Sequence, residues 1–124
     1  MNINKVLRQE TRQALDGARE MIRHYNGLYP HEDLVRDVLR ICDRLTPALI
    51  PHPRLDETRR IVEERCGFLV RVANRFSERD PASIALARAQ AISAVDLFQD
   101  AVLALRRASI PVPRTGMLLR RKSL

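Results

Sequence analysis

Apolar residues recur at three- and four-residue spacing between Pro81 and Ala108, which predicts an α-helix about 40 Å long with one buried side. The residues that line this side are Ile84, Ala87, Ala91, Val95, Phe98, Val102 and Leu105. Two flanking sets widen it, namely Leu86, Leu97 and Ala104 in one direction and Ile92 and Leu103 in the other. The narrow strip expected to face water holds Ser93, Asp96, Asp100 and Arg107. A helix with so wide an apolar surface must be covered from several directions, by helices of its own chain or of a second copy.

Two earlier segments carry the same helical periodicity. The first is expected to begin at an Asn2 or Asn4 cap and to end at Asn26-Gly27. Its predicted apolar face consists of Ile3, Val6, Leu7, Ala14, Ala18, Met21, Ile22 and Tyr25. The second is expected to begin at Pro30 and to end by Pro47. Its predicted buried residues are Leu34, Val35, Val38, Leu39, Ile41, Cys42 and Leu45.

A third helical segment is expected from about Asp56 to about Phe76. Its predicted buried residues are Ile61, Val62, Phe68, Leu69, Val72, Ala73 and Phe76. Arg65 projects into the middle of this face, and burying a charge alone costs several kcal/mol. We therefore expect Arg65 to reach a carboxylate on a neighbouring helix, with Glu10 as the first candidate, or else to extend its stem from the apolar face into water.

The four segments have short links, so neighbouring helices should run antiparallel. Asp80 is expected to cap the fourth helix, with Pro81 at its first position. We predict an all-α fold, an antiparallel (up-down-up-down) four-helix bundle over residues 1–108. Residues 109–124 are expected to form an extended basic tail, because Pro111 and Pro113 do not permit a helix. Self-association through residues 81–108 stays open, since three neighbouring helices do not comfortably cover its apolar surface.

Composition excludes several classes of protein and site. There is no run of eighteen apolar residues and no signal-peptide core at the start, so we expect no membrane span and a cytoplasmic location. Cys42 and Cys66 fall on apolar faces and are interpreted as buried free thiols rather than a disulfide or a ligand pair. His24, His31 and His52 lack metal-ligand spacing, so no metal site and no cofactor are expected.

Positive charge gathers in two places in a chain of formal net charge +7. The tail holds four basic residues and no acid: Arg114, Arg120, Arg121 and Lys122. On the first helix, five cations fall within about 60° of one another and form a stripe roughly 27 Å long, with Asp16 as the one acid among them. These cations are Lys5, Arg8, Arg12, Arg19 and Arg23. Nearly all of the basic residues are arginine, which suits phosphate binding but also arises without any function in a GC-rich genome. The stripe is therefore either a phosphate-binding surface or an ordinary solvated face.

One short motif resembles that of a known enzyme family. Arg19-Glu20-Met21-Ile22-Arg23-His24 has the spacing, Arg then four residues then His, that looks like the motif of HEPN-type ribonucleases. The resemblance would make Arg19 and His24 an RNA-cleaving pair. It covers six residues of the first helix, whereas that family carries its motif late in the chain, so we expect the protein not to be an enzyme.

Charge placement and the lack of site motifs lead to two function hypotheses. The first is a non-enzymatic accessory subunit, within a larger complex, that binds the phosphate backbone of RNA or DNA through the five cations of the first helix and the four of the tail. The alternative is a protein–protein adaptor or structural subunit of an oligomeric assembly, whose tail docks on a neighbouring subunit. Few aromatic residues are exposed, so stacking on single-stranded bases is not expected.

Overall fold

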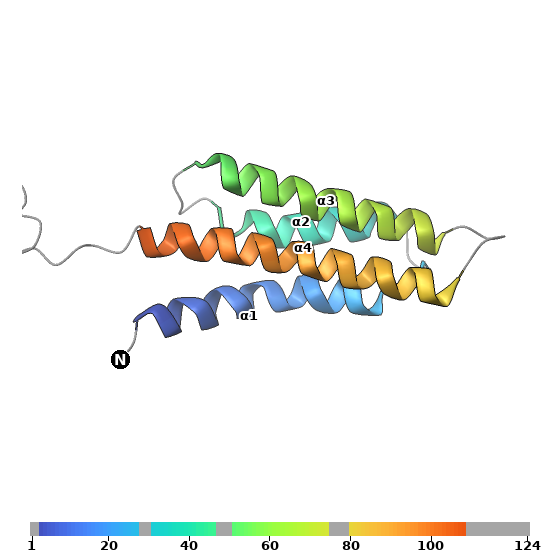
Figure 1. Cartoon of the computed structure of the whole chain (residues 1–124), viewed down its shortest axis with the longest axis horizontal. Coiled ribbons are helices and arrows are strands. Elements are labelled where there is room, and N and C mark those ends of the chain that lie inside the picture. The colour runs from blue at the N-terminus through green and yellow to red at the C-terminus, as the bar shows by residue number, and fades with distance from the viewer. Residues whose placement is uncertain (1–2, 28–30, 47–50, 75–79, 109–124) are drawn as a thin grey trace, which may run out of the picture.

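The fold is all-helical throughout the part of the chain that the structure, a computed structural model, describes: residues 3–27, 31–46, 51–74 and 80–108. These ranges hold four helices and no strand: α1 (Ile3–His24), α2 (His31–Asp43), α3 (Pro53–Ala73) and α4 (Pro81–Ala108). Figure 1 shows the four helices side by side with their long axes close to alignment. The predicted tail, residues 109–124, lies outside the described residues. No helix of the described part is long and apolar enough to cross a membrane.

Each helix packs mainly on two others, so that the four surround one core. The longest helix, α4, packs on α3 and α1, and α2 packs on the same two helices. Three contacts with α4, two from α1 and one from Tyr25 directly after it, run in reverse order along the chain: Glu10 with Arg106, Arg19 with Asp96, and the carbonyl oxygen of Tyr25 with Arg88. These two helices therefore lie antiparallel.

The N-termini of α3 and α4 are capped by side chains. Asp80 accepts hydrogen bonds from the Ala82 amide at 3.2 Å and from the Ser83 hydroxyl at 2.8 Å, and these bonds lower the pKa of its carboxyl group. The predicted start of α4 is confirmed. By contrast, α3 begins about one turn earlier than predicted, because the ring nitrogen Nδ1 of His52 accepts a hydrogen bond from the Arg54 amide at 3.0 Å and Pro53 takes the first helical position.

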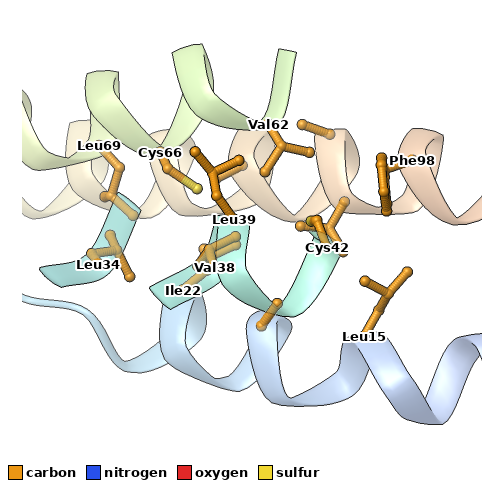
Figure 2. Packing of buried hydrophobic residues seen from close by; sticks show 14 of the residues in the cluster. Leu15, Ile22, Leu34, Val38, Leu39, Cys42, Val62, Cys66, Leu69 and Phe98 are labelled. Carbon is orange, nitrogen blue, oxygen red and sulfur yellow. The ribbon is translucent and has the colours of Figure 1, made fainter. Parts of the chain in front are cut away.

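The core is formed by side chains from all four helices. Figure 2 shows Leu15 and Ile22 of α1, Val38 of α2, Leu69 of α3 and Phe98 of α4 pointing into one shared interior. Seven residues were predicted to line the main side of α4, and six of them are buried: Ile84, Ala87, Ala91, Val95, Phe98 and Val102. The seventh, Leu105, is partly buried. Residues of α1, α3 and α4 that were absent from the predicted faces and prove to be buried include Thr11, Leu15, Leu55, Thr58, Ala94 and Ala101.

Several residues predicted to be covered are exposed instead. Phe68 is 42% exposed, Leu86 is 61% exposed and Leu97 is 40% exposed. On α1, Ile3 and Met21 are also exposed. The predicted faces of α1, α3 and α4 were therefore too wide, because the neighbouring helices cover only the central part of each.

The expected pairing of Arg65 with Glu10 is wrong. Glu10 instead accepts a hydrogen bond from Arg106 of α4 at 2.8 Å, and the same guanidinium donates to the hydroxyl of Thr11 at 2.9 Å. Arg65 is exposed, with no ion pair among the described residues. Its position at the rim of α3 removes the need for a buried partner.

The C-terminal end of α1 is held against the end of α3. The buried Tyr25 hydroxyl accepts a hydrogen bond from the side-chain amide of Asn74 at 3.0 Å. Gly27, with φ of 85°, follows the helix in the left-handed conformation, as the predicted Asn26-Gly27 stop requires. This conformation brings its backbone next to Ala73, the last residue of α3.

The two cysteines are free thiols buried in the core, as predicted. Cys42 lies on α2 and Cys66 on α3, both among the side chains drawn in Figure 2. Burial away from water raises the pKa of each thiol to about 12, because the charged thiolate would lose its hydration.

The free energy of unfolding should fall as the pH rises above 9. In the unfolded chain each thiol regains its ordinary pKa of 9.0, whereas the folded thiols stay protonated to about 12. Between these values the unfolded state binds fewer protons than the folded state, so each thiol should remove roughly 1 kcal/mol of stability by about pH 10. Urea titrations from about pH 8 to 10 measure this loss. The Cys42→Ala/Cys66→Ala variant should show a much flatter dependence, and an equal slope in that variant would contradict the assignment to the thiols.

Candidate functional site

Arg19, the fourth cation of the predicted stripe, is held inside the protein's own network. Its Nη2 contacts Asp96 of α4 at 2.8 Å and also binds the side-chain oxygen of Gln99. Its Nη1 contacts Asp16 at 3.1 Å and donates to the carbonyl oxygen of Arg12 at 3.4 Å. The side chain is only 11% exposed. Arg19 therefore links α1 to α4, and an incoming phosphate would have to displace two carboxylates.

The C-terminal part of the stripe is also paired, although more loosely. Arg23 binds Glu20 one turn earlier on α1, and the ring nitrogen Nε2 of His24 lies 3.0 Å from the other oxygen of the same carboxylate. All three side chains are at least half exposed. An exposed pair of this kind contributes little stability and can exchange partners.

A surface hollow of about 540 Å³ lies over the Arg19 network. Its charged lining balances three cations against three carboxylates, because Arg12, Arg19 and Arg23 stand beside Asp16, Glu20 and Asp96. Because the three carboxylates would repel a bound phosphate, this hollow is a poor phosphate-binding site. The predicted stripe is therefore not uniform in charge along its length.

The N-terminal half of α1 is different. Lys5, Arg8 and Arg12 are exposed on one side of the helix, over a span of about 10 Å. Arg8 and Arg12 have no ion pair among the described residues, which leaves both guanidinium groups available to a ligand. A second hollow, of about 420 Å³, runs along these three cations and is also lined by Gln9, Gln13 and Asp16.

The amide side chains of Gln9 and Gln13 were missed in the sequence analysis. Gln9 lies four residues after Lys5 and Gln13 four residues after Gln9, so both line the same hollow as Lys5. An amide can donate a hydrogen bond to an anion without adding charge. The signal was Gln at four-residue spacing after Lys5, which a search for charges alone does not detect.

Other predicted residues have a simpler outcome. The tail cations Arg114, Arg120, Arg121 and Lys122 lie outside the described residues. Arg19 and His24, the pair suggested by the ribonuclease-like spacing, have different partners, Asp96 for one and Glu20 for the other. In the described part of the chain, no group of three or more His, Cys, Asp or Glu side chains is placed to hold a metal ion.

Comparisons of the chain with protein-family models, with curated proteins and with solved structures give no match.

Proposed function

We propose that the protein is a non-enzymatic accessory subunit that binds the phosphate backbone of nucleic acid. The contact surface consists of the N-terminal half of α1 and the basic tail. The observation that supports this most directly is the pair Arg8 and Arg12, two exposed guanidinium groups one turn apart with no carboxylate partner among the described residues. Lys5 adds a third charge about one turn before Arg8, beside the same hollow.

The chemistry of this surface favours backbone contacts over base recognition. A guanidinium group can form two parallel hydrogen bonds to a phosphate and keeps its charge at any physiological pH. Tyr25 and Phe98 are buried, and the exposed ring of Phe68 lies on α3, away from the cations of α1, so none of the three offers a ring for base stacking at this surface. Of the predicted cations on α1, the proposal relies on Lys5, Arg8 and Arg12, with Arg23 as a weaker contributor and Arg19 in a structural role.

We also propose the direction of each helix in the bundle and the role of residues 109–124. We infer the up-down-up-down order of helices, supported by the antiparallel contacts between α1 and α4 and by the ion pair at 2.8 Å between Arg59, near the start of α3, and Asp43, the last residue of α2. We also infer that residues 109–124 act as a basic arm beyond α4. Two buried free thiols suit a reducing compartment such as the cytoplasm.

The salt dependence of binding tests the proposal. The full chain should bind labelled duplex DNA and RNA with an affinity that falls steeply with salt. Three contacts from α1 and four from the tail predict a log–log slope of about −6 for duplex DNA. The Arg8→Gln/Arg12→Gln variant should reduce the magnitude of this slope by about 2, and substitution of all four tail cations by Gln should reduce it by about 4. Fluorescence anisotropy at several salt concentrations measures each slope.

Two matched controls distinguish a specific binding surface on α1 from a general effect of lowering the net positive charge. Arg40→Gln/Arg44→Gln, in the last turn of α2 and directly after its end, removes the same charge from exposed positions, and it should leave the slope nearly unchanged. Arg19→Gln should lower stability and leave the slope nearly unchanged, because the Arg19 guanidinium is already bound to Asp96. The absence of binding at low salt, or an equal effect of the α2 variant, would refute the assignment to α1.

The adaptor hypothesis is favoured by a separate observation, an exposed apolar groove between α3 and α4. Such a groove is expected in a subunit of an oligomeric assembly. If the full chain fails to bind nucleic acid at low salt, a structural role becomes the better proposal.

A further inference from the structure

A hollow of about 490 Å³ lies between α3 and α4. It is lined by Ile61 and Arg65 of α3 and by Leu86, Gln90, Ser93 and Leu97 of α4. The two leucines are among the most exposed large apolar side chains of the described residues. Apolar side chains clustered in a groove mark an interaction surface more often than a chance arrangement.

The exposed surface of α4 continues beyond the hollow in both directions. Residues at four- and three-residue spacing keep one side of the helix outward, and all of them are exposed: Ala82, Leu86, Ala89, Ser93, Leu97, Asp100 and Ala104. Between the two leucines, Ala89 and Ser93 have small side chains, so another helix could approach closely at these positions. On α3, Phe68 continues the line of Ile61 and Arg65 at three- and four-residue spacing and is exposed as well.

We propose that this groove is the interface of a two-fold symmetric homodimer, in which α4 of one copy lies antiparallel against α4 of the other. Four residues at the centre of the groove, Leu86, Gln90, Ser93 and Leu97, fit their own reverse order. With the two-fold axis between positions 91 and 92, Leu86 meets the partner's Leu97, and Gln90 meets the partner's Ser93. Because the interface is isologous, each of these pairs forms twice.

The polar residues of the strip fit this register. The Gln90 amide group can donate a hydrogen bond to the hydroxyl of the partner's Ser93, which gives two such bonds near the axis. The two leucine pairs lie at the two ends of the interface. In each pair, the two leucine side chains shield one another from water. In this register polar groups therefore contact polar groups and apolar groups contact apolar groups, as a stable interface requires.

The charges at the groove support a second copy over a charged partner. Glu64 and Arg65, adjacent on α3, bring one charge of each sign to the lining. A groove without net charge offers no attraction to a nucleic acid or an anionic membrane. This separates the groove from the basic surface of α1.

The available area fits a modest dimer. The exposed strip from Ala82 to Ala104 is about 33 Å long, and two neighbouring helices offer a width of roughly 20 Å. Each copy therefore presents roughly 660 Å², somewhat below the 800 Å² or so that a standard interface uses on each side. We expect dissociation in the micromolar range rather than a permanent dimer.

Sedimentation velocity of the full chain over a wide range of concentration tests the proposal. A reversible monomer–dimer equilibrium is expected. Leu97→Glu should weaken the dimer at least tenfold, since it places two carboxylates in an apolar contact. The matched control is Met21→Glu on α1, where the side chain is 39% exposed, and this variant should leave the equilibrium unchanged. Circular dichroism should be unchanged in both, because both sites are exposed.

The register has its own test. Leu86→Glu/Leu97→Lys should restore much of the dimer lost in Leu97→Glu, because opposite charges then face each other across the interface twice. Leu86→Glu/Leu97→Glu should not restore it. The two positions are eleven residues apart on one helix, too far to pair within a single copy, so a difference between these variants supports the antiparallel register.

Three results would overturn the proposal. One is a monomer at every concentration. Another is equal weakening by Met21→Glu and Leu97→Glu. The third is dimerisation that appears only after Met117, Leu118 and Leu119 are all replaced by Glu, which would mean that the groove is occupied by the chain's own residues 109–124.

Discussion

Replacement of Phe98 by Ala is expected to lower the free energy of unfolding by about 3–5 kcal/mol. Phe98 is completely buried and is among the largest fully buried side chains of the described residues. It projects from α4, the helix that packs on both α1 and α3. Removal of the ring therefore loses its transfer free energy and leaves a cavity between helices that cannot all close in together.

The same substitution at Phe68 provides a matched control. That ring is exposed to a large extent, and its one described ring contact is the Arg71 guanidinium carbon, 5.9 Å from the ring centroid. Phe68→Ala should cost less than about 1 kcal/mol, because most of the ring's transfer free energy was never gained. Urea unfolding of the two variants compares them directly. Similar losses at both positions would contradict the placement of Phe98 in the core and Phe68 at the surface.

The burial of Phe98 could be predicted from the sequence because a regular repeat identifies the centre of a helical face. Ile84, Val95 and Phe98 lie near the middle of the apolar side of α4, where any packing partner must cover them. The edges of the face have no such constraint. Leu86 and Leu97 are as apolar as their buried neighbours, but their exposure depends on where α3 ends its contact with α4. Periodicity contains no information on that boundary.

The candidate site shows the same division. The angular positions of Lys5, Arg8 and Arg12 follow from helix geometry alone, so the sequence placed them on one face correctly. The fate of Arg19 depended on Asp96, which is 77 residues away in the chain. Because Asp96 falls on the predicted water-facing strip of another helix, no sequence pattern indicated that the two side chains meet. A contact between helices decides which cations of a stripe remain available to a ligand.

Gly27→Ala is expected to destabilise the fold by about 2–3 kcal/mol, although it adds only a methyl group. Two causes act together. An L-residue other than glycine is strained at φ of 85°. A Cβ atom at this position would also lie 2.7 Å from the carbonyl oxygen of Ala73, a backbone atom that cannot rotate away. The joint between the ends of α1 and α3 would have to open.

Two glycines inside helices, Gly17 of α1 and Gly67 of α3, are expected to show the opposite change in stability. A Cβ atom at Gly17 would meet Ile41 Cδ1 at 3.6 Å, and one at Gly67 would meet Arg71 Nη1 at 3.6 Å, both ordinary contacts. Gly17→Ala and Gly67→Ala should each stabilise the protein by about 0.5–1 kcal/mol, because alanine loses less conformational entropy in a helix. Thermal or urea unfolding of the three variants should therefore show one loss and two gains. A gain at Gly27 would mean that the chain leaves α1 by another path and that the ends of α1 and α3 are not in contact.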